Sequence, residues 1–203
     1  MRKNIRLAAI ALPLIFSACN KDATTTLTPE IPEVQAHYVF KSIRFSAASS
    51  SERATVESYP RTDFIFSNRT SVAQTAVLAT EQKSSSAFTF GHALDTLLQK
   101  LDTVFLQVPV SFGSNGQVSL GTQRWPLVNN YTVRPIDKEP TRVSVAPFEK
   151  LTVSGKITQK VLKADFTVTL QDQNSQKQKQ ITGSWTGTVP MGEDLNFQVE
   201  DLK

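Results

Sequence analysis

The side chains that most often carry out acid, base or nucleophilic chemistry are scarce in this chain. Its 203 residues include two histidines, His37 and His92, and one cysteine, Cys19. Catalysis by nucleophiles or by general acids and bases needs such groups in close pairs. The sequence also has no glycine-rich phosphate loop, zinc-ligand spacing, calcium loop or nucleophile elbow. We therefore predict that the protein is not an enzyme and has no cofactor and no metal site.

The acidic residues do not suggest a catalytic pair either. Glu193 and Asp194 fall in a predicted turn, and Asp137 and Glu139 flank prolines. Carboxylates in turns and loops are usually solvated. We also expect His92, which follows Gly91, to be a turn residue rather than a ligand.

The N-terminal residues have the layout of a secretory signal. Arg2, Lys3 and Arg6 precede an apolar run over residues 7–16. That run is too short to cross a membrane as a mature helix. Without these three charges the formal net charge falls from +4 to +1 (4 − 3 = 1), so the overall charge gives no reason to expect a nucleic-acid partner.

Cys19 carries the most specific signature in the sequence. Phe16, Ser17 and Ala18, directly before it, resemble a lipobox, in which a diacylglycerol is attached to the cysteine before cleavage on its N-terminal side. We predict that residues 1–18 are removed and that Cys19 is the lipid anchor of an exported lipoprotein. The alternative is an ordinary signal peptide that is cut at Ser17–Ala18 and leaves a free thiol. Because Asn20 rather than an aspartate follows the cysteine, the outer membrane or the cell surface is favoured.

The lysines give no nucleic-acid interface. Those at 156, 160, 163, 177 and 179 have no interleaved aromatic residues on which bases could stack. We interpret them as edge-strand lysines, which discourage pairing between sheets.

The rest of the chain alternates strand-forming runs with turns. Residues 19–35 are rich in Thr, Pro and Glu and form a predicted tether, and residues 36–203 form a predicted single β-rich domain. Alternating apolar residues predict half-buried antiparallel strands. The predicted strands are 37–45, 63–67, 71–80, 104–112, 117–120, 142–145, 151–160, 164–171, 179–189 and 195–199. Hairpin loops are predicted at 114–116 and 173–175, and apolar residues at helical spacing predict a short helix near 93–101.

Several short motifs resemble one family of membrane-active proteins. They are Asn68-Arg69-Thr70 with Gln74-Thr75, the run 105–109 with residues 113–120, Tyr131-Thr132-Val133, the run 142–147, and Ile181 to Gly187 with its Gly-x-Trp-x-Gly pattern. Together they resemble the epsilon-toxin and mosquitocidal-toxin branch of the aerolysin-like β-pore-forming proteins. The resemblance implies elongated, twisted antiparallel sheets, with the stalk and β-sandwich of that family.

The resemblance also implies a function. In that family several protomers each contribute one amphipathic hairpin, and the hairpins close into a transmembrane barrel. Here the inserting hairpin corresponds to residues 82–106, and the residues it would carry into lipid are Phe88, Phe90, Leu94, Leu97, Leu98, Leu101, Val104 and Leu106. The expected partners are a lipid membrane and further copies of the chain.

This chain departs from the family pattern in two places. The stretch from Leu94 to Leu101 has helical spacing rather than clean alternation, and only residues 36–67 stand where a receptor-binding region would normally precede the long strands. The alternative function is therefore a non-catalytic surface or periplasmic lipoprotein with a β-rich binding or structural role.

Overall fold

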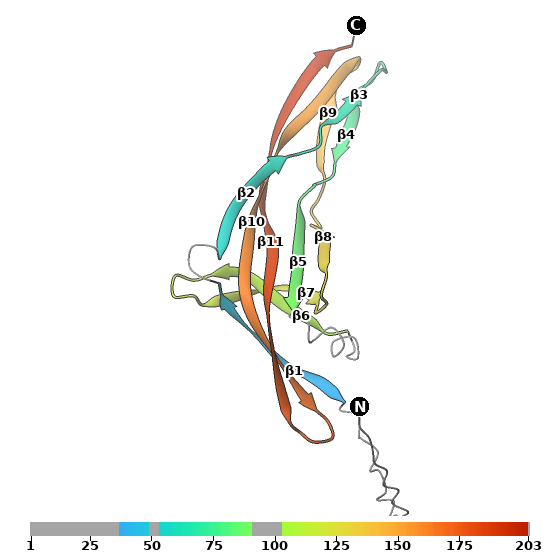
Figure 1. Cartoon of the computed structure of the whole chain (residues 1–203). Helices are drawn as coiled ribbons and strands as arrows, with labels where there is room; N and C mark the ends of the chain where they lie inside the picture. Colours follow the sequence, from blue (N-terminus) through green and yellow to red (C-terminus); the bar gives the residue numbers. More distant parts are fainter. Residues whose placement is uncertain (1–36, 49–52, 91–102, 203) are drawn as a thin grey trace, which may run out of the picture. The chain divides into compact units, whose positions relative to one another are not determined.

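Two strands of 24 residues each, β10 (Glu149–Asp172) and β11 (Gln178–Asp201), form one antiparallel hairpin at the centre of the main sheet (Figure 1). The protein is described from a computed structural model, which describes residues 37–48, 53–90 and 103–202. Every regular secondary-structure element in these ranges is a β-strand, so the predicted all-β class is confirmed. The predicted tether and the predicted helix near 93–101 lie outside the described residues. Among the described residues there is no candidate for a membrane-spanning helix.

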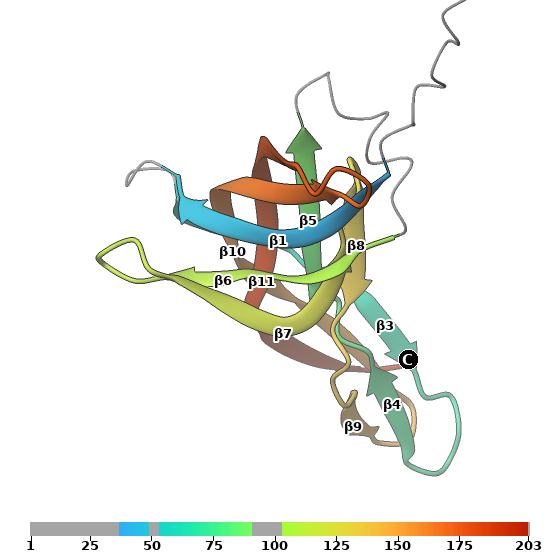
Figure 2. The same ribbon diagram turned by 90° about the horizontal axis from the view of Figure 1, so that it is seen from below.

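The other strands fall into three sheets. The remaining strands are β1 (Tyr38–Ala47), β2 (Ala54–Pro60), β3 (Phe64–Ser67), β4 (Gln74–Leu78), β5 (Lys83–Phe90), β6 (Phe105–Phe112), β7 (Val118–Pro126), β8 (Tyr131–Pro135) and β9 (Thr141–Val145). The main sheet has the order β1-β10-β11-β5-β8, with β2 and β3 also paired to β10. The strands β4 and β9 form one separate pair and β6 and β7 another, all antiparallel (Figure 2).

The long hairpin buries opposite faces at its two ends. In β10 the odd-numbered residues Leu151, Val153 and Ile157 are buried, whereas the even-numbered residues from Leu162 to Leu170 are buried further along. Neighbouring residues of a strand point to opposite faces. Two cores therefore form on opposite faces of one hairpin.

A β-bulge in β11 accompanies this change of face. Thr158 of β10 pairs with Gly192, while Gln159 pairs with Pro190, so that Met191 is an extra residue in β11. An extra residue shifts the alternation of the strand that carries it. As a result, odd-numbered residues of β11 reach both cores: Trp185 lies in the first and Leu195 packs against the second.

Each core is closed by one of the separate strand pairs. The first core joins β10, β11 and β5 to the β6–β7 pair through Leu106 and Trp125. The second joins Leu151 and Val153 of β10 to the β4–β9 pair through Leu78 and Val145.

Two glycines of β11 make room for large rings in the first core. A Cβ atom on Gly187 would overlap a ring carbon of Trp185, and one on Gly183 would lie 2.5 Å from a ring carbon of Phe166. The two glycines of the Gly-x-Trp-x-Gly pattern therefore allow the core to pack closely, because a β-carbon at either position would overlap an aromatic ring.

Turn chemistry explains the predicted hairpin loops. Gly113 N–H donates to Gln117 O at 2.8 Å, and Gly116 has the positive φ of 80° that glycine tolerates best. In the β10–β11 loop, the Asp172 carboxylate accepts hydrogen bonds from Ser175 Oγ at 2.6 Å and Asn174 N–H at 3.1 Å. These bonds, the one from Ser175 Oγ first, lower the pKa of Asp172. Both predicted loops are confirmed.

Several local predictions are wrong. Each long strand is continuous where two strands were predicted, and β2, β5 and β8 were not predicted as strands. Glu193 and Asp194 lie within β11 and not in a turn. Lys156 and Lys160 lie on an interior stretch of β10, paired to β11 on one side and β2 on the other, and so are not edge lysines.

We expect Gly187→Ala to lower the free energy of unfolding by about 1–3 kcal/mol, because the new methyl group overlaps Trp185. Gly192→Ala is the matched control, since nothing lies within 4 Å of a Cβ at that position of the same strand. Both variants lose similar unfolded-chain entropy, so the difference between them in urea unfolding isolates the overlap. Equal stabilities would refute this packing argument.

Candidate functional site

The predicted inserting segment begins with β5, and those residues predicted to enter lipid that the structure describes lie in or against the first core. Phe88 and Phe90 of β5 and Leu106 of β6 are buried, with Phe88 only 2 % exposed, and Val104 packs against the same cluster. The other predicted residues of this segment, Leu94, Leu97, Leu98 and Leu101, lie outside the described residues. So do Cys19 and the lipobox residues Phe16, Ser17 and Ala18.

The two limbs of this segment belong to different sheets. Residues 85–90 of β5 pair with residues 183–188 of β11, and residues 83–87 pair with β8. The other limb, β6, pairs with β7 instead. The strands β5 and β6 are therefore on opposite sides of the first core and do not pair with each other as a hairpin.

A cluster of aromatic rings holds the second half of β5. The ring of Phe166 on β10 contacts the rings of Phe90 and Phe88 edge-on, with centroid distances of 5.1 and 5.5 Å. Phe45 of β1 adds a contact with Trp185 at 6.0 Å. Such pairs contribute about 0.5–1.5 kcal/mol each beyond the area they bury.

The first half of β5 is held by hydroxyl groups instead. Trp185 Nε1–H donates to Ser86 Oγ at 2.8 Å, and the hydroxyls of Ser85 and Thr188 share a hydrogen bond of 2.8 Å. Both serines are buried. The side-chain contacts of this half are thus two hydrogen bonds, each contributing about 0.5–1.5 kcal/mol, in place of a cluster of buried rings.

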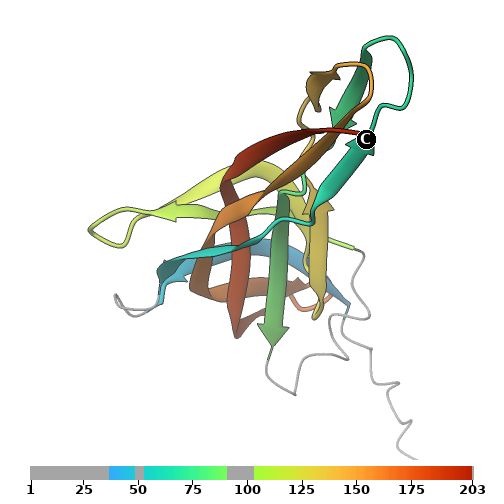
Figure 3. The ribbon, with the colours of Figure 1, turned by 90° about the horizontal axis from the view of Figure 1, so that it is seen from above.

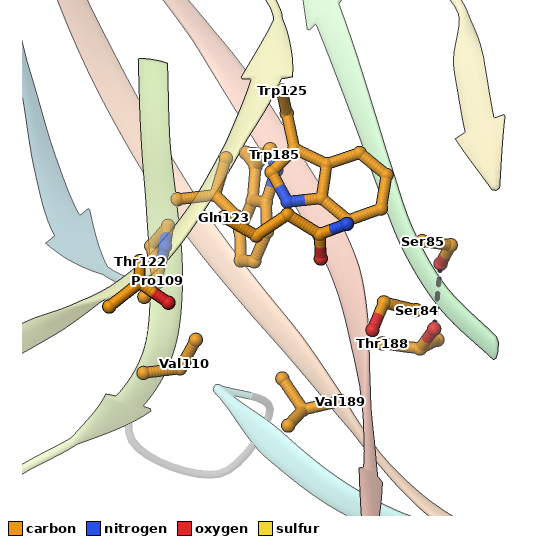
Figure 4. Close-up of a pocket in the computed structure, with 12 residues that line it drawn as sticks. Ser84, Ser85, Pro109, Val110, Thr122, Gln123, Trp125, Trp185, Thr188 and Val189 are labelled. Carbon is orange, nitrogen blue, oxygen red and sulfur yellow. Dashed lines mark hydrogen bonds between the residues drawn. The ribbon is translucent and has the colours of Figure 1, made fainter. Parts of the chain in front are cut away.

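A cavity of about 230 Å³ lies beside this polar half (Figure 4). Its walls come from β5, β6, β7 and β11, and its lining is uncharged: Ser84, Ser85, Val108, Pro109, Val110, Gly121, Thr122, Gln123, Trp125, Trp185, Thr188 and Val189. The guanidinium of Arg134 on β8 lies 5.0 Å from the ring centre of Trp125, which links β8 to the β6–β7 pair. We name this region, comprising β5, its two serine contacts and the cavity, the β5 seam.

A buried ion cluster fixes the chain just before β5. Arg61 Nη2 donates to Ala79 O at 3.1 Å, and its Nε lies 3.7 Å from Glu193 Oε1. Glu193 also accepts hydrogen bonds from Thr80 Oγ1 and Glu81 N–H, both at 2.9 Å. The side chains of Arg61 and Glu193 are 4 % and 7 % exposed, so Glu193 is a buried, paired charge and not a solvated one.

The buried ion cluster affects the pKa of the neighbouring Tyr59. Burial, followed by the Glu193 and Glu81 carboxylates, raises the pKa of the Tyr59 phenol above its usual value. Arg61 Nε is buried without a hydrogen-bond acceptor within bonding geometry. The cluster ties the 79–82 linker to β11, and no periodicity or motif in the sequence predicts it.

The Asn68 motif has a structural role in this chain. Asn68 is fully buried, and its Nδ2 donates to the carbonyls of Val72, Val145 and Ala146 at 2.8–3.0 Å. Its Oδ1 accepts from the backbone and hydroxyl of Thr70 at 3.0 and 2.7 Å. One amide side chain therefore fastens the loop after β3 to the end of β9.

Comparisons with known proteins give structural similarity only. No family model and no curated protein matches the chain. Among solved structures, it is similar to the lamprey immune protein, with 14 % identity over 80 % of this chain and 53 % of that one and a TM-score of 0.46. It is also similar to an aerolysin-like protein of Bombina maxima (12 % identity, 78 % and 97 %, TM-score 0.32) and to the parasporin-2 toxin of Bacillus thuringiensis (10 %, 82 % and 73 %, 0.30).

The chain spans about half the length of the lamprey protein. The solved structures to which it is similar include aerolysin-like proteins and crystal toxins, the group that the sequence motifs resemble.

We expect Phe88→Ala to lower the free energy of unfolding by about 3–5 kcal/mol, because it empties the centre of the aromatic cluster. Thr89→Ala, one residue further on the exposed face of the same strand, should change it by less than about 0.5 kcal/mol. Chemical unfolding measures both. A loss below about 1 kcal/mol for Phe88→Ala would mean that β5 is not anchored by this ring.

Proposed function

We propose that this chain is a lipid-anchored protein that assembles into an oligomer and perforates a membrane, with residues 82–106 as the membrane-crossing hairpin. The observation that carries the proposal is the placement of the two limbs, β5 and β6, in different sheets joined through the β5 seam. Both limbs can leave their sheets while β10 and β11 stay paired along their length. The family resemblance of the sequence motifs supports the same function.

Release of β5 breaks its pairing with β11 and β8, and its side chains add a moderate cost. Exposing Phe88 and Phe90 to water costs about 1.5–3 kcal/mol each, and much of this is regained if the rings enter lipid. At the other end of β5, two serine contacts and a cavity stand where a packed core would otherwise hold the strand. A moderate cost is what a segment that moves between two environments requires.

The pattern of β5 also suits a membrane-crossing strand. Ser86, Phe88 and Phe90 point to one face, and Ser85, Ala87 and Thr89 to the other. A spanning strand needs one face for lipid and one for water. The phenylalanines would supply the first, and the small and hydroxyl side chains the second.

We further propose that Cys19 carries the anchor. The tether from Cys19 to Gln35 has 17 residues (35 − 19 + 1 = 17), which reach about 60 Å at most when fully extended. A lipid on Cys19 would thus keep the β-rich domain within that distance of the membrane surface and raise its local concentration there.

A second candidate function is a membrane-tethered binding module that forms no pore. It is favoured by the burial of Phe88, Phe90 and Leu106, which are core residues in this arrangement. The two functions differ in whether β5 must leave β11.

A disulfide across β5 and β11 distinguishes them. Thr89 and Ser184 are exposed and directly opposite each other, so Thr89→Cys with Ser184→Cys can form a bond of ordinary geometry. We expect the oxidised full-length variant to release no dye from vesicles of phosphatidylethanolamine and phosphatidylglycerol, and reduction to restore release. The measurement is the fluorescence of an entrapped dye.

The matched control joins strands that the proposal leaves in place. Ser46→Cys with Asp165→Cys lies on β1 and β10 and is equally exposed and directly opposite. This control variant should release dye from the vesicles both when it is oxidised and when it is reduced. Leakage from the locked β5 variant would overturn the proposal for residues 82–106, while no leakage from any form across several lipid compositions would favour the binding module.

Cys19→Ser tests the anchor independently. We expect this variant to move from the membrane fraction to the soluble fraction after cell fractionation, because the acyl chains can no longer be attached. Recovery of the variant in the membrane fraction would count against lipidation.

A further inference from the structure

Two strands of the main sheet expose free edges at the same end of β10. There β3 pairs with β10 on one side and the last residues of β11 pair with it on the other (Figures 1 and 3). In the described part of the chain, no further strand pairs with the outer edge of β3 or with residues 189–201 of β11. A free edge presents unpaired N–H and C=O groups that another strand can bind.

Apolar side chains follow these edges in matching rows. Phe66, Leu151 and Val199 are directly opposite one another, and so are Phe64, Val153 and Phe197. These rows lie on the face of the second core, yet Phe197 is 43 % and Val199 55 % exposed. The apolar face of the second core therefore extends to the β11 edge, where it is exposed to solvent.

The rows would continue unbroken into a second molecule. Since β3 and β11 both run antiparallel to β10, they run parallel to each other, and β3 of another copy can be added beside β11 in the same direction. Val199 would then lie beside Phe66 of the added copy, and Phe197 beside Phe64. Both exposed side chains would be covered by the same type of apolar contact that exists within one chain.

The charges at the two edges are complementary. The β11 edge ends in Glu200 and Asp201, whereas the chain beyond β3 carries the exposed Arg69. In the joined arrangement Asp201 would lie beside Asn68 of the added copy, one residue from its Arg69. Within one chain Lys150 already pairs with Glu200 at 2.7 Å, so Asp201 is the acid left for this contact.

We propose that copies of this chain assemble head to tail, with the β11 edge over residues 196–201 of one copy pairing in parallel with the β3 edge over residues 64–67 of the next. This interface deepens the proposed function, on which its oligomer rests. Different patches on the two partners give a ring when the rotation between copies closes. An edge this short falls well below the area of about 1,000 Å² that stable complexes bury, so assembly needs the concentration that anchoring on a membrane provides.

Paired cysteines give a test specific to this interface. Ile65 and Gln198 are exposed and share a row with Thr152 between them, which puts them two strand spacings, or about 9.5 Å, apart in one chain. That exceeds the reach of about 7 Å for a disulfide. The full-length variant Ile65→Cys with Gln198→Cys can therefore link only different copies. On the vesicles described above, mild oxidation should give a ladder of covalent oligomers on non-reducing gels.

The controls separate the interface from other contacts. Each single-cysteine variant should stay monomeric, and a dimer from Gln198→Cys alone would overturn the head-to-tail arrangement in favour of β11 against β11. Adding Phe197→Lys to the cysteine pair should abolish the ladder, because it places a charge in the apolar row. Adding Leu120→Lys, which alters an equally exposed residue on β7, should preserve it. Circular dichroism checks that both lysine variants fold.

The outcomes distinguish this interface from the pore itself. A ladder together with dye release from the reduced protein supports both proposals. Dye release without a ladder overturns the interface and leaves the pore. A ladder without dye release under any condition supports the interface and overturns the pore function, and the absence of both overturns the two together.

Discussion

Side chains of a β-strand alternate between two faces, and this constraint shapes the whole protein. β10 uses one set of alternating residues for the core at one end and the opposite set for the core at the other, so its two halves must be covered from opposite sides. The extra residue Met191 lets β11 follow this change. The strand pairs β6–β7 and β4–β9 are placed where they are because each covers one of these faces.

The mechanism that we propose follows from this division of labour. The strands that define both cores, β10 and β11, are held by continuous pairing, whereas β5 is held by rings at one end and by hydroxyls at the other. A molecule that must keep its shape while one segment leaves benefits from such unequal attachment. The same hairpin exposes the β11 edge and holds β3, and the outer edges of these two strands are those on which we propose that copies assemble.

The sequence was informative where local chemistry decides the structure. Alternation in Phe166, Val168 and Leu170 and the loop at 114–116 correctly indicated strands and turns. The sequence was not informative where pairing between residues far apart in the chain decides the structure. The polar start of β5 forms a strand because β8 pairs with Lys83 to Ala87 and β11 pairs with the strand from Ser85 onward. Likewise Glu193 is buried because Arg61, far away in sequence, neutralises it.

The cavity beside β5 opens to solvent, so water can reach its walls before any strand moves. When β5 leaves its sheet, this cavity therefore contributes little to the change in volume. Hydrostatic pressure favours whichever state has the smaller volume. Compression would thus gain little from this cavity and would not replace a membrane in drawing β5 out of its sheet.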